Sequence, residues 1–168
     1  LGLRTSSHGD DRDTYRLMVL SDLFGGGPYS KLFKNVREKY SLCYYCAARP
    51  NRTKGYMLVD SGGEPANAER AEKEILNQLE DIKNGSFTDE DIDASVKALE
   101  DSFKSVTDSP EALDSWFMSQ CVSGRYNYPE DFIDEFKRVT REDIIKAAQD
   151  VTLDTVFMLE GTAKGGDC

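Results

Sequence analysis

A central amphipathic helix is the feature that most constrains the fold of this chain. Its apolar residues recur at spacings of four, three, four and three, and they are Ile92, Val96, Leu99, Phe103 and Val106. This period lines one face of an α-helix with apolar side chains, which must be buried against other elements. The preceding Thr88-Asp89-Glu90-Asp91 resembles a capping box, with Asp in the fourth place instead of Glu or Gln. We therefore predict a helix that begins after Thr88 and packs on a core.

Strand patterns stand at both ends and in the middle of the chain, with helix patterns between them. The predicted strands cover residues 1–7, 42–48, 56–60 and 156–159, and a turn at 51–55 joins the middle two into a hairpin. Besides the central helix, predicted helices cover residues 13–24 and 66–84 or begin at Pro28, at Pro110 and after Thr140. This order predicts an α+β fold, with helices packed on one face of an antiparallel β-sheet.

Length and charge exclude several classes of protein. The 168 residues fit one domain, which we expect to cover residues 1–161, followed by a flexible tail at 162–168. The net charge of −10 argues against binding to nucleic acid or to an anionic membrane surface. No run approaches the roughly 20 apolar residues of a membrane span. The first residues read as a strand without an initiator Met, so we expect an excised domain of a longer protein.

The chain has few residues that bind zinc. His8 is its only histidine, whereas a zinc hydrolase of the His-x-x-Glu-His type needs two imidazoles and a carboxylate. Cys43 and Cys46 form a Cys-x-x-Cys motif, which occurs in redox pairs and zinc knuckles. No second pair has zinc spacing, and a strand lacks the helix N-terminus that stabilises a redox thiolate. Buried, reduced structural thiols in a cytoplasmic protein are the favoured interpretation.

The Gly-rich segment from Phe24 to Lys31 has two interpretations. Glycines ahead of a helix can bind phosphate. This segment lacks the Gly-Lys-Ser/Thr ending of a phosphate loop, follows a helix instead of a strand, and carries Pro28, which has no N–H donor. A tight turn between two helices is therefore the favoured interpretation.

Arg37 and Tyr44 are the remaining candidates for chemistry. Arg37 lies near the end of the helix that begins at Pro28, and Tyr44 follows seven residues later at the start of the predicted strand. Arg offers a fixed fork of donors to a carbonyl or carboxylate, and a Tyr hydroxyl can donate to an oxyanion. From the residues alone two structural roles stay open, since Arg37 could cap its own helix and Tyr44 could fill a half-buried strand position.

Three phrases in order resemble a known family, and they are Leu23-Phe24-Gly25-Gly26-Gly27-Pro28-Tyr29-Ser30-Lys31-Leu32-Phe33, Val36-Arg37-Glu38-Lys39 and Leu42-Cys43-Tyr44-Tyr45. They resemble the pitrilysin and insulin-degrading family of zinc peptidases, which includes the mitochondrial processing peptidases. Similar phrases at residues 54–57, 85–92, 139–144 and 153–156 extend the resemblance along the chain. The resemblance implies a processing-peptidase or LuxS-like fold and paired domains that close around a chamber. In such proteins one domain holds zinc through an inverted His-x-x-Glu-His motif, and the other lacks it.

The resemblance implies that this chain is the zinc-free, C-terminal domain of a bacterial member. Arg37 and Tyr44 would then bind the substrate peptide and stabilise its oxyanion at a zinc site in another domain. That domain would be the N-terminal domain of the same protein or a homologous subunit, and this chain would hold no metal or cofactor itself. The Gram-positive branch, which the chain resembles most, includes members that lack the zinc motif. A structural partner subunit for an active homologue is therefore the alternative.

Two departures from the family pattern concern the same site. Cys43 stands where Gly or Ala is common, and Tyr45 adds a second phenol. Either Tyr44 or Tyr45 could therefore face the chamber. A Cys-x-x-Cys redox or metal module remains a third hypothesis.

Overall fold

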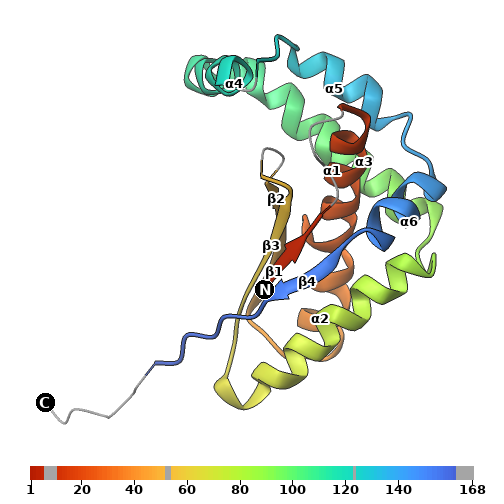
Figure 1. The fold of residues 1–168 in the computed structure, drawn as a ribbon, viewed down its shortest axis with the longest axis vertical. Helices are drawn as coiled ribbons and strands as arrows, with labels where there is room; N and C mark the ends of the chain where they lie inside the picture. Colours follow the sequence, from red (N-terminus) through yellow and green to blue (C-terminus); the bar gives the residue numbers. More distant parts are fainter. Residues whose placement is uncertain (6–10, 52–53, 123, 162–168) are drawn as a thin grey trace, which may run out of the picture.

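A single antiparallel sheet organises the fold in the computed structural model, which describes residues 1–5, 11–51, 54–122 and 124–161. The strands follow the order β2-β3-β1-β4, with β1 at Gly2–Arg4, β2 at Tyr45–Asn51, β3 at Tyr56–Gly62 and β4 at Thr152–Thr155. Helices lie on one face of this sheet, and the opposite face carries no helix of the described chain (Figure 1). The predicted α+β fold is therefore confirmed.

The helices differ in their relation to the sheet. Their bounds are α1 (Asp11–Gly25), the π-helix η1 (Leu32–Lys39), the 3₁₀ turn η2 (Pro65–Asn67), α2 (Ala68–Lys83), α3 (Asp89–Lys104), the 3₁₀ turn η3 (Ser105–Asp108), α4 (Pro110–Val122), α5 (Pro129–Phe136) and α6 (Arg141–Gln149). Figure 1 shows α1 and α2 beside the sheet, whereas α4 and α5 lie beyond one end of it. Helix α1 packs on β2 and also contacts α3, α5 and α6, so it is the central helix of the layer.

The core lies between the sheet and α1. On β3, Met57 and Val59 are buried while Tyr56 and Leu58 are exposed, as the two-residue period of a strand requires. Helix α1 buries a broad apolar surface, comprising Leu17, Val19, Leu20, Leu23 and Phe24. Because these side chains are buried against both the sheet and the other helices, packing on several sides stabilises α1.

An aromatic cluster extends the core beyond the sheet. The Phe132 ring of α5 lies edge-on to Tyr15 at 5.0 Å and to Trp116 at 5.1 Å between ring centroids. Phe103 stacks on it at 5.4 Å, and Phe136 lies edge-on to Phe103 at 5.0 Å. Edge-on and offset-stacked pairs are the arrangements that aromatic rings prefer. The cluster thus joins α1, α3, α4 and α5.

The predicted central helix is confirmed as α3, including its capping box between Thr88 and Asp91. The apolar stripe is buried less evenly than its period indicates. Phe103 is buried, but Ile92, Val96 and Leu99 are only partly covered, and Ser95 is fully buried. Helix α3 packs against both α1 and α5. The face that it buries therefore includes Ser95 and does not coincide with the apolar stripe. The helix ends at Lys104, and Val106 follows in η3.

Two predicted strands have different limits in the structure. The expected strand at 156–159 is wrong, because β4 pairs with β1 through residues 152–155, and the apolar residues after it are exposed. Strand β2 begins at Tyr45 instead of Leu42, so Tyr44 lies just before the strand. Apolar content suggested both predictions, whereas hydrogen-bonded pairing defines the strands. His8 and the expected tail at 162–168 lie outside the described residues.

Candidate functional site

The candidate site is a corner where η1 turns into β2. The backbone of η1 is wound with hydrogen bonds five residues apart, such as Tyr40 N–H to the Asn35 carbonyl at 3.0 Å. Leu42 N–H then donates to the Val36 carbonyl at 3.0 Å, across Ser41, whose φ is +51°. π-Helical turns are rare and occur often at functional sites. The sequence predicted a helix here but gave no sign of its π-winding.

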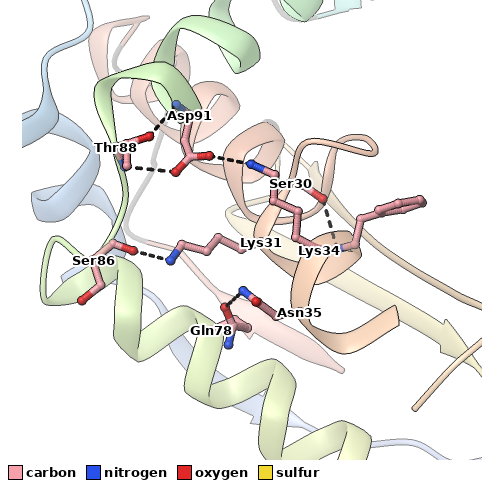
Figure 2. Close-up of polar contacts among 9 residues, drawn as sticks. Ser30, Lys31, Lys34, Asn35, Gln78, Ser86, Thr88 and Asp91 are labelled. Carbon is pink, nitrogen blue, oxygen red and sulfur yellow. Dashed lines mark hydrogen bonds and ion pairs between the residues drawn. The ribbon is translucent and has the colours of Figure 1, made fainter. Parts of the chain in front are cut away.

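Polar side chains fix η1 and its N-cap Lys31 against α2, α3 and the segment between these two helices (Figure 2). The three contacts run from Lys31 to the Ser86 carbonyl, from Lys34 to Asp91 at 2.8 Å and from Asn35 to Gln78 at 2.6 Å. Burial disfavours the Asp91 carboxylate, but hydrogen bonds from Lys34 and Thr88 outweigh it and lower the Asp91 pKa. Leu32 and Val36 are fully buried on the same helix. The position of Arg37 is thus set by contacts on both polar and apolar sides of η1.

The Gly-rich segment forms the turn between α1 and η1, as predicted. At Gly25 an added Cβ would lie 2.5 Å from the Ala48 amide nitrogen, so only glycine allows this approach of α1 to β2. The N–H groups of Gly26 and Ser30 donate to carbonyls of Asp22 and Gly27, at 2.7 and 2.9 Å. These donors are used within the turn, which supports a structural role over phosphate binding.

At this corner Arg37 is half-buried and Tyr44 is exposed, and the two side chains contact different partners. The Arg37 guanidinium lies 4.5 Å from the centre of the Phe33 ring and 3.7 Å from the Glu38 carboxylate. Tyr44 is 65% exposed, and its hydroxyl donates to the Glu64 carboxylate. That hydrogen bond raises the Tyr44 pKa, so the phenol remains a proton donor. Tyr44 is therefore too exposed to be a half-buried strand residue, which was the structural alternative for it.

Tyr45 occupies a different environment from Tyr44. It is the first residue of β2, is 53% exposed, and pairs with Gly62 in the strand register. Its ring covers the Gly62 backbone so closely that a Cβ there would lie 2.4 Å from a ring carbon. Tyr44 is therefore the tyrosine of the pair whose hydroxyl contacts a carboxylate. Which of the two faces a substrate chamber stays a prediction.

Glu64 is the residue at this corner that the sequence interpretation missed. Gly62 and Gly63 bring it there, because the Tyr44 N–H donates to the Gly62 carbonyl at 2.7 Å. A Cβ at Gly63 would lie 2.9 Å from the Leu42 carbonyl oxygen, so this segment passes directly against the corner. The available signal for Glu64 was a pair of adjacent glycines followed by Glu, beginning two residues after the end of a predicted strand.

The Cys-x-x-Cys motif is buried, as predicted. Cys43 and Cys46 are free thiols with little exposure. Burial and the neighbouring Cys43 raise the pKa of Cys46 to about 12, which disfavours the thiolate needed for redox chemistry or metal binding. Among the described residues, no group of three or more His, Cys, Asp or Glu side chains has a metal-binding arrangement. Nor is any described helix both long and apolar enough to cross a membrane.

Three known proteins share the sequence or the fold. "Probable inactive metalloprotease YmfF" of Bacillus subtilis is 41% identical over 163 residues, which are 96% of this chain and 38% of that protein. A conserved protein of Enterococcus faecalis V583 is 28% identical with a TM-score of 0.81, covering 90% of this chain and 36% of the other. The inactive peptidase domain of a Bordetella parapertussis protein has the same fold, with a TM-score of 0.74 at 12% identity, covering 90% of this chain and 87% of that domain.

Two of these relatives are much longer than this chain. It spans less than two-fifths of the Bacillus and Enterococcus proteins, but most of the Bordetella domain. A family model described as the peptidase M16 inactive domain matches residues 1–99, which is more than half of the chain. The chain therefore belongs to the peptidase M16 family, as an inactive domain of this zinc-protease type.

Proposed function

We propose that this chain is the zinc-free C-terminal domain of a longer zinc-dependent processing peptidase and helps to form its peptide-binding chamber. The observation that carries the proposal is the corner between η1 and β2, where the half-buried Arg37 and the exposed Tyr44 both carry hydrogen-bond donors. Family membership supports the type of parent protein. The greater length of the relatives leaves room for a second domain that holds zinc.

The two side chains suit the binding of a peptide and of its reacting carbonyl. Arg37 stacks on Phe33, which orients its planar donors toward a carbonyl or carboxylate of the peptide. The Tyr44 hydroxyl can donate to the oxygen that becomes negative during hydrolysis. Neither group is a nucleophile for this reaction, so the attacking water and the zinc that would activate it would have to come from the other domain.

Tyr44→Phe in the longer protein tests this role directly. Loss of the hydroxyl is expected to lower peptide turnover by about a hundredfold while peptide affinity changes little, because the donor acts mainly on the oxyanion. Steady-state kinetics of a fluorogenic peptide, with direct binding measurements, separate the two effects. Tyr56→Phe removes an exposed phenol from β3 and serves as the control. Unchanged turnover in Tyr44→Phe contradicts the proposal.

A structural partner subunit is the second candidate function. The Bacillus subtilis relative, at 41% identity, carries the name of an inactive metalloprotease, which favours a parent without a zinc motif. In that case the chain would bind a homologous active subunit and leave cleavage to it. Finding or not finding His-x-x-Glu-His in the longer protein separates the two candidates.

The free, buried thiols of Cys43 and Cys46 support the further proposal of a reducing, cytoplasmic location.

A further inference from the structure

We propose that Glu64 is a positioning residue that holds the Tyr44 hydroxyl in the unliganded site and competes with the substrate for its single proton. The proposal rests on the function proposed for Tyr44 and adds a residue to it. The Tyr44 hydroxyl donates to the Glu64 carboxylate, although the two residues are 20 positions apart in sequence. A phenol has one O–H to donate, so it cannot donate to Glu64 and to a substrate oxygen at once.

Backbone contacts present the Glu64 carboxylate at this place. The Tyr44 N–H donates to the Gly62 carbonyl at 2.7 Å, which ties the tyrosine to the segment that carries Glu64. On the other side, the Glu64 carbonyl accepts the Asn67 N–H at 2.9 Å, and Pro65 begins the η2 turn. Backbone hydrogen bonds therefore hold the chain on both sides of Glu64. They keep its carboxylate within reach of the Tyr44 hydroxyl.

The charge of Glu64 determines which substrate state can displace it. A carboxylate accepts a hydrogen bond about twice as strongly as a neutral carbonyl does. The carbonyl of a bound peptide is therefore a poor competitor for the Tyr44 proton, whereas the oxyanion that forms during hydrolysis carries a comparable charge. The Tyr44–Glu64 hydrogen bond is therefore kept in the ground state and broken in the transition state, so its cost adds to the barrier for turnover.

The experiment compares Glu64→Gln with wild type in two ways. In this chain, ¹³C-labelled tyrosine NMR follows the Tyr44 signal, which Tyr44→Phe identifies by its loss. Glu64→Gln is expected to shift the Tyr44 titration to lower pH, and Glu64→Asp to restore part of the shift. Glu69→Gln, on the first turn of α2, is the matched control and leaves the signal in place. In the longer protein, Glu64→Gln gives Tyr44 a weaker, neutral acceptor to leave in the transition state, so kcat is expected to rise about three- to tenfold with little change in KM.

The outcomes separate this inference from the proposed function. A Tyr44 titration that is unchanged in Glu64→Gln overturns the role of Glu64, whatever the activity. A shifted titration with kcat equal to wild type overturns the competition with the substrate oxyanion. If Tyr44→Phe has normal turnover while Glu64→Gln still shifts the titration, the proposed function of Tyr44 fails and the Glu64 contact stands.

Discussion

Phe132→Ala is expected to lower the free energy of unfolding by about 3–5 kcal/mol, the usual cost of truncating a buried aromatic ring. Phe132 is 1% exposed, and its ring contacts Tyr15, Phe103 and Trp116. The substitution removes apolar surface from the core and leaves a cavity among rings from several helices, which cannot all move inward to fill it. Urea unfolding followed by circular dichroism measures the change, with an unchanged m-value as the sign of two-state behaviour.

Phe157→Ala is the matched control for this prediction. Phe157 is 79% exposed after the end of β4, so its truncation is expected to change stability by less than about 0.5 kcal/mol. Equal losses in the two variants would mean that the aromatic cluster does not hold the helices together as the structure indicates.

Gly25→Val is expected to destabilise the domain by about 3 kcal/mol or more, because it forces a side chain into packed backbone. An added Cβ at this position would lie 2.5 Å from the Ala48 amide nitrogen and 2.8 Å from the Ala48 Cβ. Helix α1 and strand β2 would have to separate, and β2 begins directly after Tyr44. The same unfolding measurement applies, and we also expect the Tyr44 NMR signal to move.

Gly161→Val provides the comparison, since nothing lies within 4 Å of an added Cβ there. Its expected effect on stability is below about 0.5 kcal/mol. A Gly25→Val variant as stable as Gly161→Val would contradict the close contact between α1 and β2.

Elements with local signals are predictable from this sequence. Thr88 and Thr140 are the N-caps of α3 and α6, and each forms a capping box with an Asp three residues later. Such a signal lies within four residues, so it is readable without knowledge of the fold. The turn at Gly25 is readable for the same reason. These elements also explain why the α+β fold was predictable.

Features that depend on distant pairing are not predictable in this way. Strand β4 is defined by its partner β1, which lies about 150 residues earlier, and all of its own residues are exposed. The contact between Tyr44 and Glu64 depends on the hairpin register that pairs Tyr45 with Gly62. Arg37 and Tyr44 were candidates from the residues themselves, and a family resemblance implied their role, whereas Glu64 was identified only from the folded hairpin.

The proposed role makes this chain a zinc-free domain whose chemistry depends on zinc held elsewhere. The most direct test of this role is the zinc content of the purified chain, measured together with peptide hydrolysis with and without a chelator. We predict far less than one zinc per chain and no chelator-sensitive hydrolysis, because the chain has a single histidine. About one zinc per chain, with hydrolysis that a chelator abolishes, would contradict the claim.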